Sequence, residues 1–343
     1  MRPWLRNVLV TALMLALIAV FLRNASLAEV WRVVRTAHWP LVGAGVVCLF
    51  TSYALRAVRW QLMLAPLGRT HFGPALRATV IGFAASFILP ARAGEVIRPW
   101  LLARREGLDA AAVFATVVIE RMLDLVAVLL LLGVFLLVFD PGLSALDPAL
   151  FAAVRAGGMA AAVAAVVGVG ALAACAARPE LLARLVRAAT GWMPRRMADA
   201  VSTLAEAFVG GLAVVRDPSR IAWAVAWSIP LWVVIAAQIW VVSLAVGVVL
   251  PWSGSLLIMA MLVVGVAVPT PGAVGGFHEA YRLGATTFFG IENDHAVGAA
   301  IVLHAVGFVP TLIAGAWLMA GEGLSMTHLG GAVQRARDEE TRR

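Results

Sequence analysis

Three charged side chains lie close together in the stretch ILPARAGEVIRPW, residues 88–100. Arg92 and Arg98 each carry a planar guanidinium group whose forked N–H donors match the oxygens of a phosphate. Glu95 lies between them and offers a carboxylate that can balance a cationic group or carry a proton. These residue types indicate a binding site for a phosphate-containing molecule, although the same charges would also suit an ordinary cytoplasmic loop.

The backbone around these side chains is not expected to form one continuous helix. Pro90 has no amide N–H and interrupts a helix, whereas Gly94 lets the chain turn or a ligand approach closely. A second stretch, VPTPGAVGGFHEAYR, residues 268–282, has the same character and contains the pair His278 and Glu279. Its helix-breaking residues are Pro269, Pro271, Gly272, Gly275 and Gly276. This stretch is either a plain loop or a broken helix whose new N-terminus directs its positive dipole end at an anion.

A third group of charges, Glu120, Arg121 and Asp124, lies within the apolar sequence VIERMLDLV. At about 100° per residue, the three side chains share an arc of roughly 100° on one helix face. Because a charged side chain facing lipid is costly, this face is predicted to point into the protein. The group either ties helices together or allows Arg121 to meet an anionic headgroup.

The two broken stretches belong to a predicted internal repeat. Each runs from an apolar segment through Pro, Gly and Glu to a Gly-aliphatic-acid start of a long apolar segment, at Gly107 in one copy and Gly290 in the other. Fourteen residues after these glycines lie Arg121 and His304. A lone histidine usually serves packing, so its correspondence with Arg121 is the reason to include His304 among the candidate site residues.

The elements that must position these residues are membrane helices. With 62% apolar and 13% charged residues, the chain has too little polar surface for a water-soluble fold. The sequence predicts an all-α polytopic membrane protein with about six full spans and two Pro/Gly-broken re-entrant hairpins. The predicted spans are 8–22, 40–55, 111–139, 151–177, 221–249 and 296–320, and the apolar segments too short to span are 76–89 and 255–268.

The arginines predict the orientation. All 27 basic residues are Arg, and most of them fall on the cytoplasmic side if both termini are cytoplasmic. The two hairpins then open to opposite sides, which is an inverted repeat, and such repeats place a transporter's site near the membrane midplane. Arg56 and Arg59 are expected at the end of the second span, where they would reach lipid phosphates.

The chain is predicted to form a single integral membrane domain, 1–343. Its parts are a first half, 5–177, with a hairpin at 76–105; a cytoplasmic amphipathic segment, 178–220; a second half, 221–322, with a hairpin at 255–289; and a cytoplasmic tail, 323–343.

Four sequence elements, LPARAGEVIR, ATVVIERMLDL, LRAVRW and PTPGAVGGFHEA, resemble the membrane domain of the lysylphosphatidylglycerol synthase family, a group of flippase-like membrane proteins. The resemblance covers roughly residues 5 to 322 and implies a translocase that moves a lipid between leaflets. In that family a separate soluble domain transfers the aminoacyl group, and we expect this chain to lack it, since about 23 residues follow the last predicted span. Ala273 stands where the family pattern has Gly, and His278 stands beside the Glu, which leaves the headgroup preference open.

The leading prediction is therefore a lipid translocase of the cytoplasmic membrane that moves an anionic or aminoacylated phospholipid, or a lipid-linked glycan. Arginines would bind phosphate, while Glu95 and Glu279 would counter a cationic group or titrate. We expect no enzyme, cofactor or metal, and the absence of Lys rules out a P-loop ATPase. The alternatives are a membrane-embedded transferase acting on lipid-linked sugars or headgroups, and an ion-coupled secondary transporter.

The expected partners are membrane lipids, anionic or phosphate-containing. A homo-oligomer or a separate lipid-modifying enzyme is a further possible partner. The net charge of +8 is spread over several loops without a nucleic-acid-binding motif, so we predict no nucleic-acid partner.

Overall fold

The computed structural model describes residues 15–23, 25–89, 92–138, 210–267 and 270–321, with scattered residues between 152 and 208. Over these residues the fold is all-helical, as predicted, and contains no strand. Several predicted parts lie wholly or mostly outside the described residues. They are the beginning of span 8–22, span 151–177, most of segment 178–220, the tail 323–343, Pro90 and Pro269.

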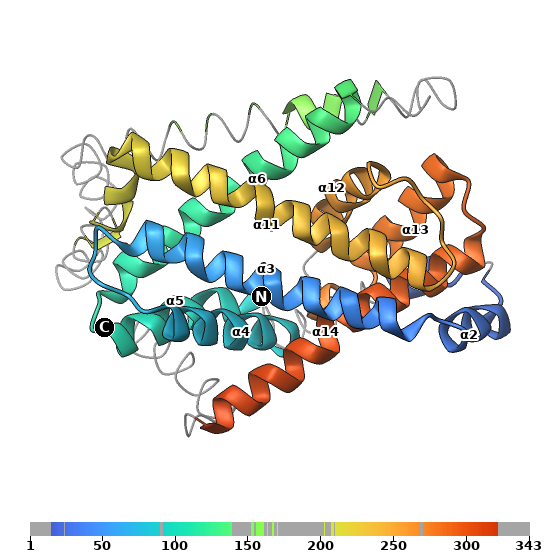
Figure 1. Cartoon of the computed structure of the whole chain (residues 1–343), viewed down its shortest axis with the longest axis horizontal. Coiled ribbons are helices and arrows are strands. Elements are labelled where there is room, and N and C mark those ends of the chain that lie inside the picture. Colours follow the sequence, from blue (N-terminus) through green and yellow to red (C-terminus); the bar gives the residue numbers. More distant parts are fainter. Residues whose placement is uncertain are drawn as a thin grey trace, which may run out of the picture.

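Four long helices form the body of the protein: α3 (Trp39–Leu64), α6 (Ala110–Val138), α11 (Pro218–Ala245) and α14 (Asn293–Gly321). Among the described residues α3, α11 and α14 are long and apolar enough to cross a membrane. The described α6 is as long as α14, at 29 residues, but carries three charges in its middle. Figure 1 shows α3 and α11 lying side by side across the molecule.

Short helices occur in two pairs. The first pair is α4 (Phe72–Ile88) and α5 (Gly94–Glu106), and the second is α12 (Gly254–Ala267) and α13 (Gly276–Phe289). The members of each pair pack against each other, and the 3₁₀ turn η3 (Pro271–Ala273) lies at the break of the second pair. A short amphipathic helix, α2 (Leu27–Arg35), packs on α14, and the 3₁₀ turn η2 (Leu212–Arg216) precedes α11.

The order short, short, long occurs twice along the chain. Helices of 17, 13 and 29 residues form α4, α5 and α6, and helices of 14, 14 and 29 residues form α12, α13 and α14. The second short helix of each set ends at a glycine in the left-handed region, Gly107 with φ 69° and Gly290 with φ 62°. Such a C-terminal cap needs glycine because a Cβ is unfavourable there. These are the two glycines from which the predicted repeat was aligned.

Glycines also hold the two short helices of each pair together. A Cβ at Gly94 would collide with the carbonyl oxygen of Gly82, and a Cβ at Gly265 would collide with the carbonyl oxygen of Gly276. In both pairs, therefore, the backbones of the two helices approach closely where only glycine fits.

The apolar core has two main parts that meet along α6 and α11. One part lies among α3, α4, α5 and the first half of α6, and the other among α2, α12, α13, α14 and the second half of α6. Charged side chains of α3, α5 and α6 lie near the boundary between these parts.

One expectation about α3 is wrong. The helix runs to Leu64, well beyond the predicted end at residue 55. Arg56 and Arg59 consequently lie inside the helix, where they are 6% and 0% exposed, and do not reach the surface. The long apolar sequence on both sides of these arginines extends the helix and buries them against α6.

Candidate functional site

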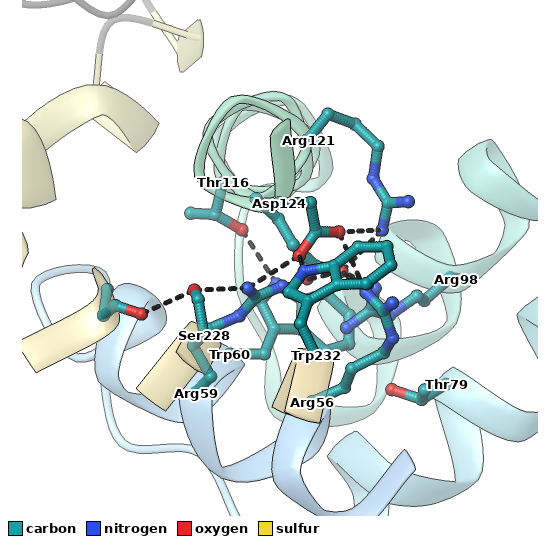
Figure 2. Close-up of polar contacts among 12 residues, drawn as sticks. Arg56, Arg59, Trp60, Thr79, Arg98, Thr116, Arg121, Asp124, Ser228 and Trp232 are labelled. Carbon is teal, nitrogen blue, oxygen red and sulfur yellow. Dashed lines mark hydrogen bonds and ion pairs between the residues drawn. The ribbon is translucent and has the colours of Figure 1, made fainter. Parts of the chain in front are cut away.

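Two carboxylates of α6 form the centre of a buried charge cluster. Glu120 is fully buried and Asp124 is 5% exposed. Figure 2 shows guanidinium groups from three helices turned toward this point: Arg56 and Arg59 from α3, Arg98 from α5 and Arg121 from α6 itself. The predicted inward face of α6 is thus the side on which the cluster forms.

Asp124 binds α3 and α11 to α6. Its Oδ1 accepts hydrogen bonds from Arg59 Nη1 at 2.7 Å and from the indole of Trp232 at 3.1 Å, and its Oδ2 accepts one from Arg56 at 3.0 Å. Arg59 also donates to the hydroxyl of Ser228 on α11 at 2.6 Å. A buried carboxylate is tolerated because these donors replace water around it.

Glu120 binds α5 to the same cluster. Its Oε1 accepts from Arg98 Nη1 at 2.8 Å, from Arg121 Nη2 at 2.6 Å and from Arg56 Nη1 at 3.3 Å. The guanidinium of Arg98 also lies 3.9 Å from the ring centroid of Trp60, which places the cation on an aromatic face. Arg98, predicted as a phosphate ligand, is therefore partly committed to internal contacts.

Two adjoining cavities lie beside the cluster. The larger, of about 480 Å³, is lined by residues of α3, α4, α6, α11, α12, α13 and α14 and by the turn η3. Its wall is mostly apolar and aromatic, and its polar side chains are Ser52, Tyr53, Arg56, Arg92, Arg121, Asp124, Gln238 and His304. This volume and composition are typical of a site for an organic ligand with a few polar groups.

The smaller cavity, of about 150 Å³, lies where the breaks of the two helix pairs meet. Arg92, Glu95 and Arg98 line it from the first pair, and Val266, Thr270, Gly272 and Ala273 line it from the second. Arg121 lines both cavities. The N-terminus of α5, at Gly94, also faces this space, so its positive dipole end adds to the arginine charges.

A direct hydrogen bond joins the two breaks. Arg92 Nη2 donates to the backbone carbonyl of Val266 at the end of α12. Each break also contains a residue other than glycine in the left-handed region, Arg92 with φ 52° and Ala273 with φ 56°. Such conformations cost free energy and are concentrated at functional sites. Ala273 occupies this conformation at the position where the resemblance seen in the sequence leads us to expect Gly.

The second pair of helices contributes a different chemistry. His304 Nε2–H donates to the carbonyl of Gly272 at 2.8 Å, and so holds the break against α14. The ring centroids of His278 and His304 lie 4.6 Å apart. Nδ1 of His278 accepts a hydrogen bond from the backbone amide of Gly275 at 3.3 Å. His304 lines the larger cavity, whereas His278 lines neither of the two cavities.

Glu279 is not brought to these cavities. It pairs with Arg282 on its own helix at 2.5 Å and lines neither the larger nor the smaller cavity. Glu95, its sequence counterpart, lines the smaller cavity and lies 3.8 Å from Arg92. Arg282, one turn along α13, therefore occupies the carboxylate of Glu279, although Glu95 and Glu279 both follow a Pro/Gly break.

Sequence reasoning assigned no site role to five residues that the structure places in or beside the charge cluster: Arg56, Arg59, Trp60, Ser228 and Trp232. A signal for the two arginines was present, because they are three residues apart in an apolar segment and would share a face if the helix continued. Ser228 and Trp232 had no such signal, because their role depends on how α11 packs against α3.

A chain of long apolar helices enclosing buried charges and a mostly apolar cavity is a multi-pass helical membrane protein. The protein belongs to the family described as the lysylphosphatidylglycerol synthase TM region, which it matches over residues 5–315.

The chain is also similar to the glycosyltransferase AglD of Haloferax volcanii. The two are 28% identical over 358 aligned positions, which cover 97% of this chain and 57% of that protein. The chain thus spans little more than half the length of this relative.

Proposed function

We propose that the protein is a lipid translocase that carries the headgroup of a phosphate-containing lipid between the leaflets of the membrane. The observation that carries this proposal is the cavity of about 480 Å³, which is lined from both helix pairs and holds guanidinium groups in an otherwise apolar wall. A charged headgroup needs a polar path through the bilayer, and arginines beside apolar side chains suit an amphiphile.

The helix arrangement supports a specific transport architecture. In the proposal, α4/α5 and α12/α13 are re-entrant hairpins of an inverted repeat, and the cavity between their breaks lies near the membrane midplane. The protein would reside in the cytoplasmic membrane with both termini cytoplasmic. The paired breaks, joined by Arg92 and Val266, would move relative to each other as access changes sides.

The charged residues divide into two proposed roles. Arg56, Arg92 and Arg121 line the larger cavity and would bind phosphate oxygens. Glu95, at the rim of the smaller cavity, would balance a cationic part of a headgroup or the neighbouring arginines. Asp124 is proposed as a fixed counter-ion, because arginines of α3 already occupy it.

A membrane-embedded transferase acting on lipid-linked sugars is a second candidate, favoured by the name of the relative AglD. This chain covers only 57% of that protein, so the named activity can belong to the part that is not shared. Glu120 and Asp124 are each bound by two or more arginines, and a carboxylate held in this way is a weak general base. An ion-coupled transporter of other amphiphiles would be favoured by ion dependence without lipid dependence.

The test is a leaflet-exchange assay with purified protein in liposomes that carry fluorescent lipids of several headgroups. Wild type is expected to expose inner-leaflet lipid of one headgroup class to an external quencher. Arg121→Gln is expected to slow exchange about tenfold or more, because a hydrogen bond to a charged group contributes roughly 1.5–3 kcal/mol. Glu279→Gln, a matched control outside the cavities, should exchange lipid at the wild-type rate. Modification of a lipid-linked sugar without lipid exchange would instead support the transferase.

A further inference from the structure

The charge cluster contains more arginines than carboxylates. In the described part of the chain, four guanidinium groups, from Arg56, Arg59, Arg98 and Arg121, surround the two carboxylates of Glu120 and Asp124. Arg92 and Glu95 at the rim form one further pair and leave the excess unchanged. The cluster therefore carries two positive charges more than its own acidic groups can balance.

The excess charge faces the cavities. Arg59 is fully buried and pairs with Asp124 at 2.7 Å, so its charge is compensated internally. Arg98 lines the smaller cavity, Arg56 lines the larger one and Arg121 lines both. Among the described residues, the buried side-chain atoms without a hydrogen-bond partner are Nε and Nη2 of Arg59, Nε and Nη2 of Arg98, Nε of Arg121 and Oε2 of Glu120. Five of these six atoms are donors, which are normally satisfied when buried, and those of Arg98 and Arg121 belong to side chains that line the cavities, so they fit a ligand that accepts hydrogen bonds.

Buried charges of one sign are stable only when a partner balances them. An anion with two negative charges in the cavities would neutralise the excess of two, whereas a phosphodiester carries one negative charge. A headgroup that combines one phosphate with cationic amines would add positive charge to a region that already has too much. The aromatic and aliphatic wall of the larger cavity suits an attached apolar chain.

We propose, building on the proposed function, that the ligand is a lipid whose anchoring group carries two negative charges, a phosphate monoester or a diphosphate esterified at both ends. Arg98 joins the arginines of the proposed function in binding this group, at the place where Arg121 lines both cavities. The charge of the group completes the electrostatics of the cluster. Aminoacylated phosphatidylglycerol is a poor ligand for the same reason.

The test compares two detergent-like probes that differ by one charge, dodecyl phosphate and methyl dodecyl phosphate. Binding to the purified full chain is measured by competition against a fluorescent alkyl phosphate, without any transport step. At pH 8 the monoester is dianionic, because its second pKa is about 6, and the diester is monoanionic. We expect the monoester to bind about tenfold or more tightly, since one additional ion pair at an effective dielectric near 20 is worth at least that ratio.

Lowering the pH to 5 protonates the monoester, so both probes then carry one charge and their affinities should converge. Glu95, Asp124 and His304 also face the cavities, and the diester measured in parallel cancels any titration of these protein groups. Equal affinities at pH 8 would overturn the proposal. So would displacement by inorganic phosphate near the Kd of the monoester, because the site would then take the free ion.

Two variants test whether the preference for the monoester arises at the charge cluster. Arg121→Gln is expected to reduce the preference for the monoester, and Arg32→Gln, which changes an exposed arginine of α2, is expected to keep it. An unchanged preference in folded Arg121→Gln would contradict the assignment, and the pH comparison in wild type decides the matter if this variant does not fold. Tight monoester binding without lipid exchange in liposomes would remove the translocase function but leave this inference intact.

Discussion

The two helix pairs, α4/α5 and α12/α13, use one backbone design for two chemistries. Both are broken near a residue with positive φ, both pack through glycine contacts, and both end at a left-handed glycine. The first break nevertheless carries Arg92, Glu95 and Arg98, whereas the second carries His278 beside a cluster of aromatic rings. Both breaks thus shape the cavities, whereas the charges of the cavities come from the first pair together with α3 and α6.

The long helices that follow differ in the same way. Arg121 of α6 corresponds to His304 of α14, and Asp124 corresponds to Gly307. All four residues line the larger cavity, so charges on one side face a histidine and a small residue on the other. A headgroup can be anchored electrostatically by the first half while the second half leaves room for it.

The charge cluster of the first half should be the most sensitive part of the protein. Asp124→Asn removes one of two carboxylates among four arginines, which should lower the free energy of unfolding by about 3–5 kcal/mol. Glu29→Gln, in an exposed ion pair with Arg32, should change it by less than about 1 kcal/mol. Chemical denaturation in detergent micelles measures the free energy of unfolding of both variants. Equal stability of the two variants would show that the cluster does not hold α3, α6 and α11 together.

The feature that both pairs share can be broken by adding one methyl group. Gly94→Ala and Gly265→Ala should each destabilise the protein by about 1–3 kcal/mol, because the new Cβ meets backbone atoms of the facing helix. Gly133→Ala in α6 is the control, since a Cβ there meets nothing within 4 Å. The measurement is the thermal unfolding temperature of the three variants. Equal temperatures for Gly94→Ala and Gly133→Ala would contradict the close approach of α4 and α5.

Changes in the second half of the chain should have a moderate effect on stability and on ligand binding. His304→Leu removes the donor to the Gly272 carbonyl and leaves the charge cluster intact. It should lower the free energy of unfolding by about 1–3 kcal/mol. Binding of an alkyl phosphate should weaken less than in Arg121→Gln. His295→Gln, at an exposed contact with Glu292 near the start of the same helix, serves as control. A greater loss of binding in His304→Leu than in Arg121→Gln would assign the anchoring role to the second half.

The smallest effect should come from the second carboxylate. Glu279→Gln breaks a pair within α13 that lies outside both cavities, so lipid exchange should stay within about twofold of wild type, a change of less than about 0.5 kcal/mol. Glu95→Gln changes a residue of the smaller cavity and should slow exchange more. The measurement is the leaflet-exchange rate of the two variants, Glu279→Gln and Glu95→Gln. Equal slowing by both would mean that the two carboxylates act together, as the sequence alone suggested.

The apolar runs of the sequence predicted the long and short helices well, because their length and hydrophobicity are local properties. The repeat was also visible, since Gly107 and Gly290 serve as helix caps through their own backbone conformation. The burial of Arg56 and Arg59 was not predicted, because their partner Asp124 lies far away in the sequence. The pairing of Glu279 with Arg282 was not predicted, although their spacing of three residues places them one turn apart on a helix.

In the proposed function, a lipid headgroup enters the two adjoining cavities between the helix pairs. Site-specific photo-crosslinking tests it most directly, with a photoreactive phenylalanine at Phe87 of the first pair, at Phe277 of the second, and at Trp317 on the outer face of α14 as reference. We predict that Phe87 and Phe277 capture the same class of phosphate-containing lipid, enriched over the bulk lipid captured at Trp317. Capture of no lipid at the two cavity positions, or of the bulk lipid mixture at all three positions, would contradict the entry of a headgroup into the cavities.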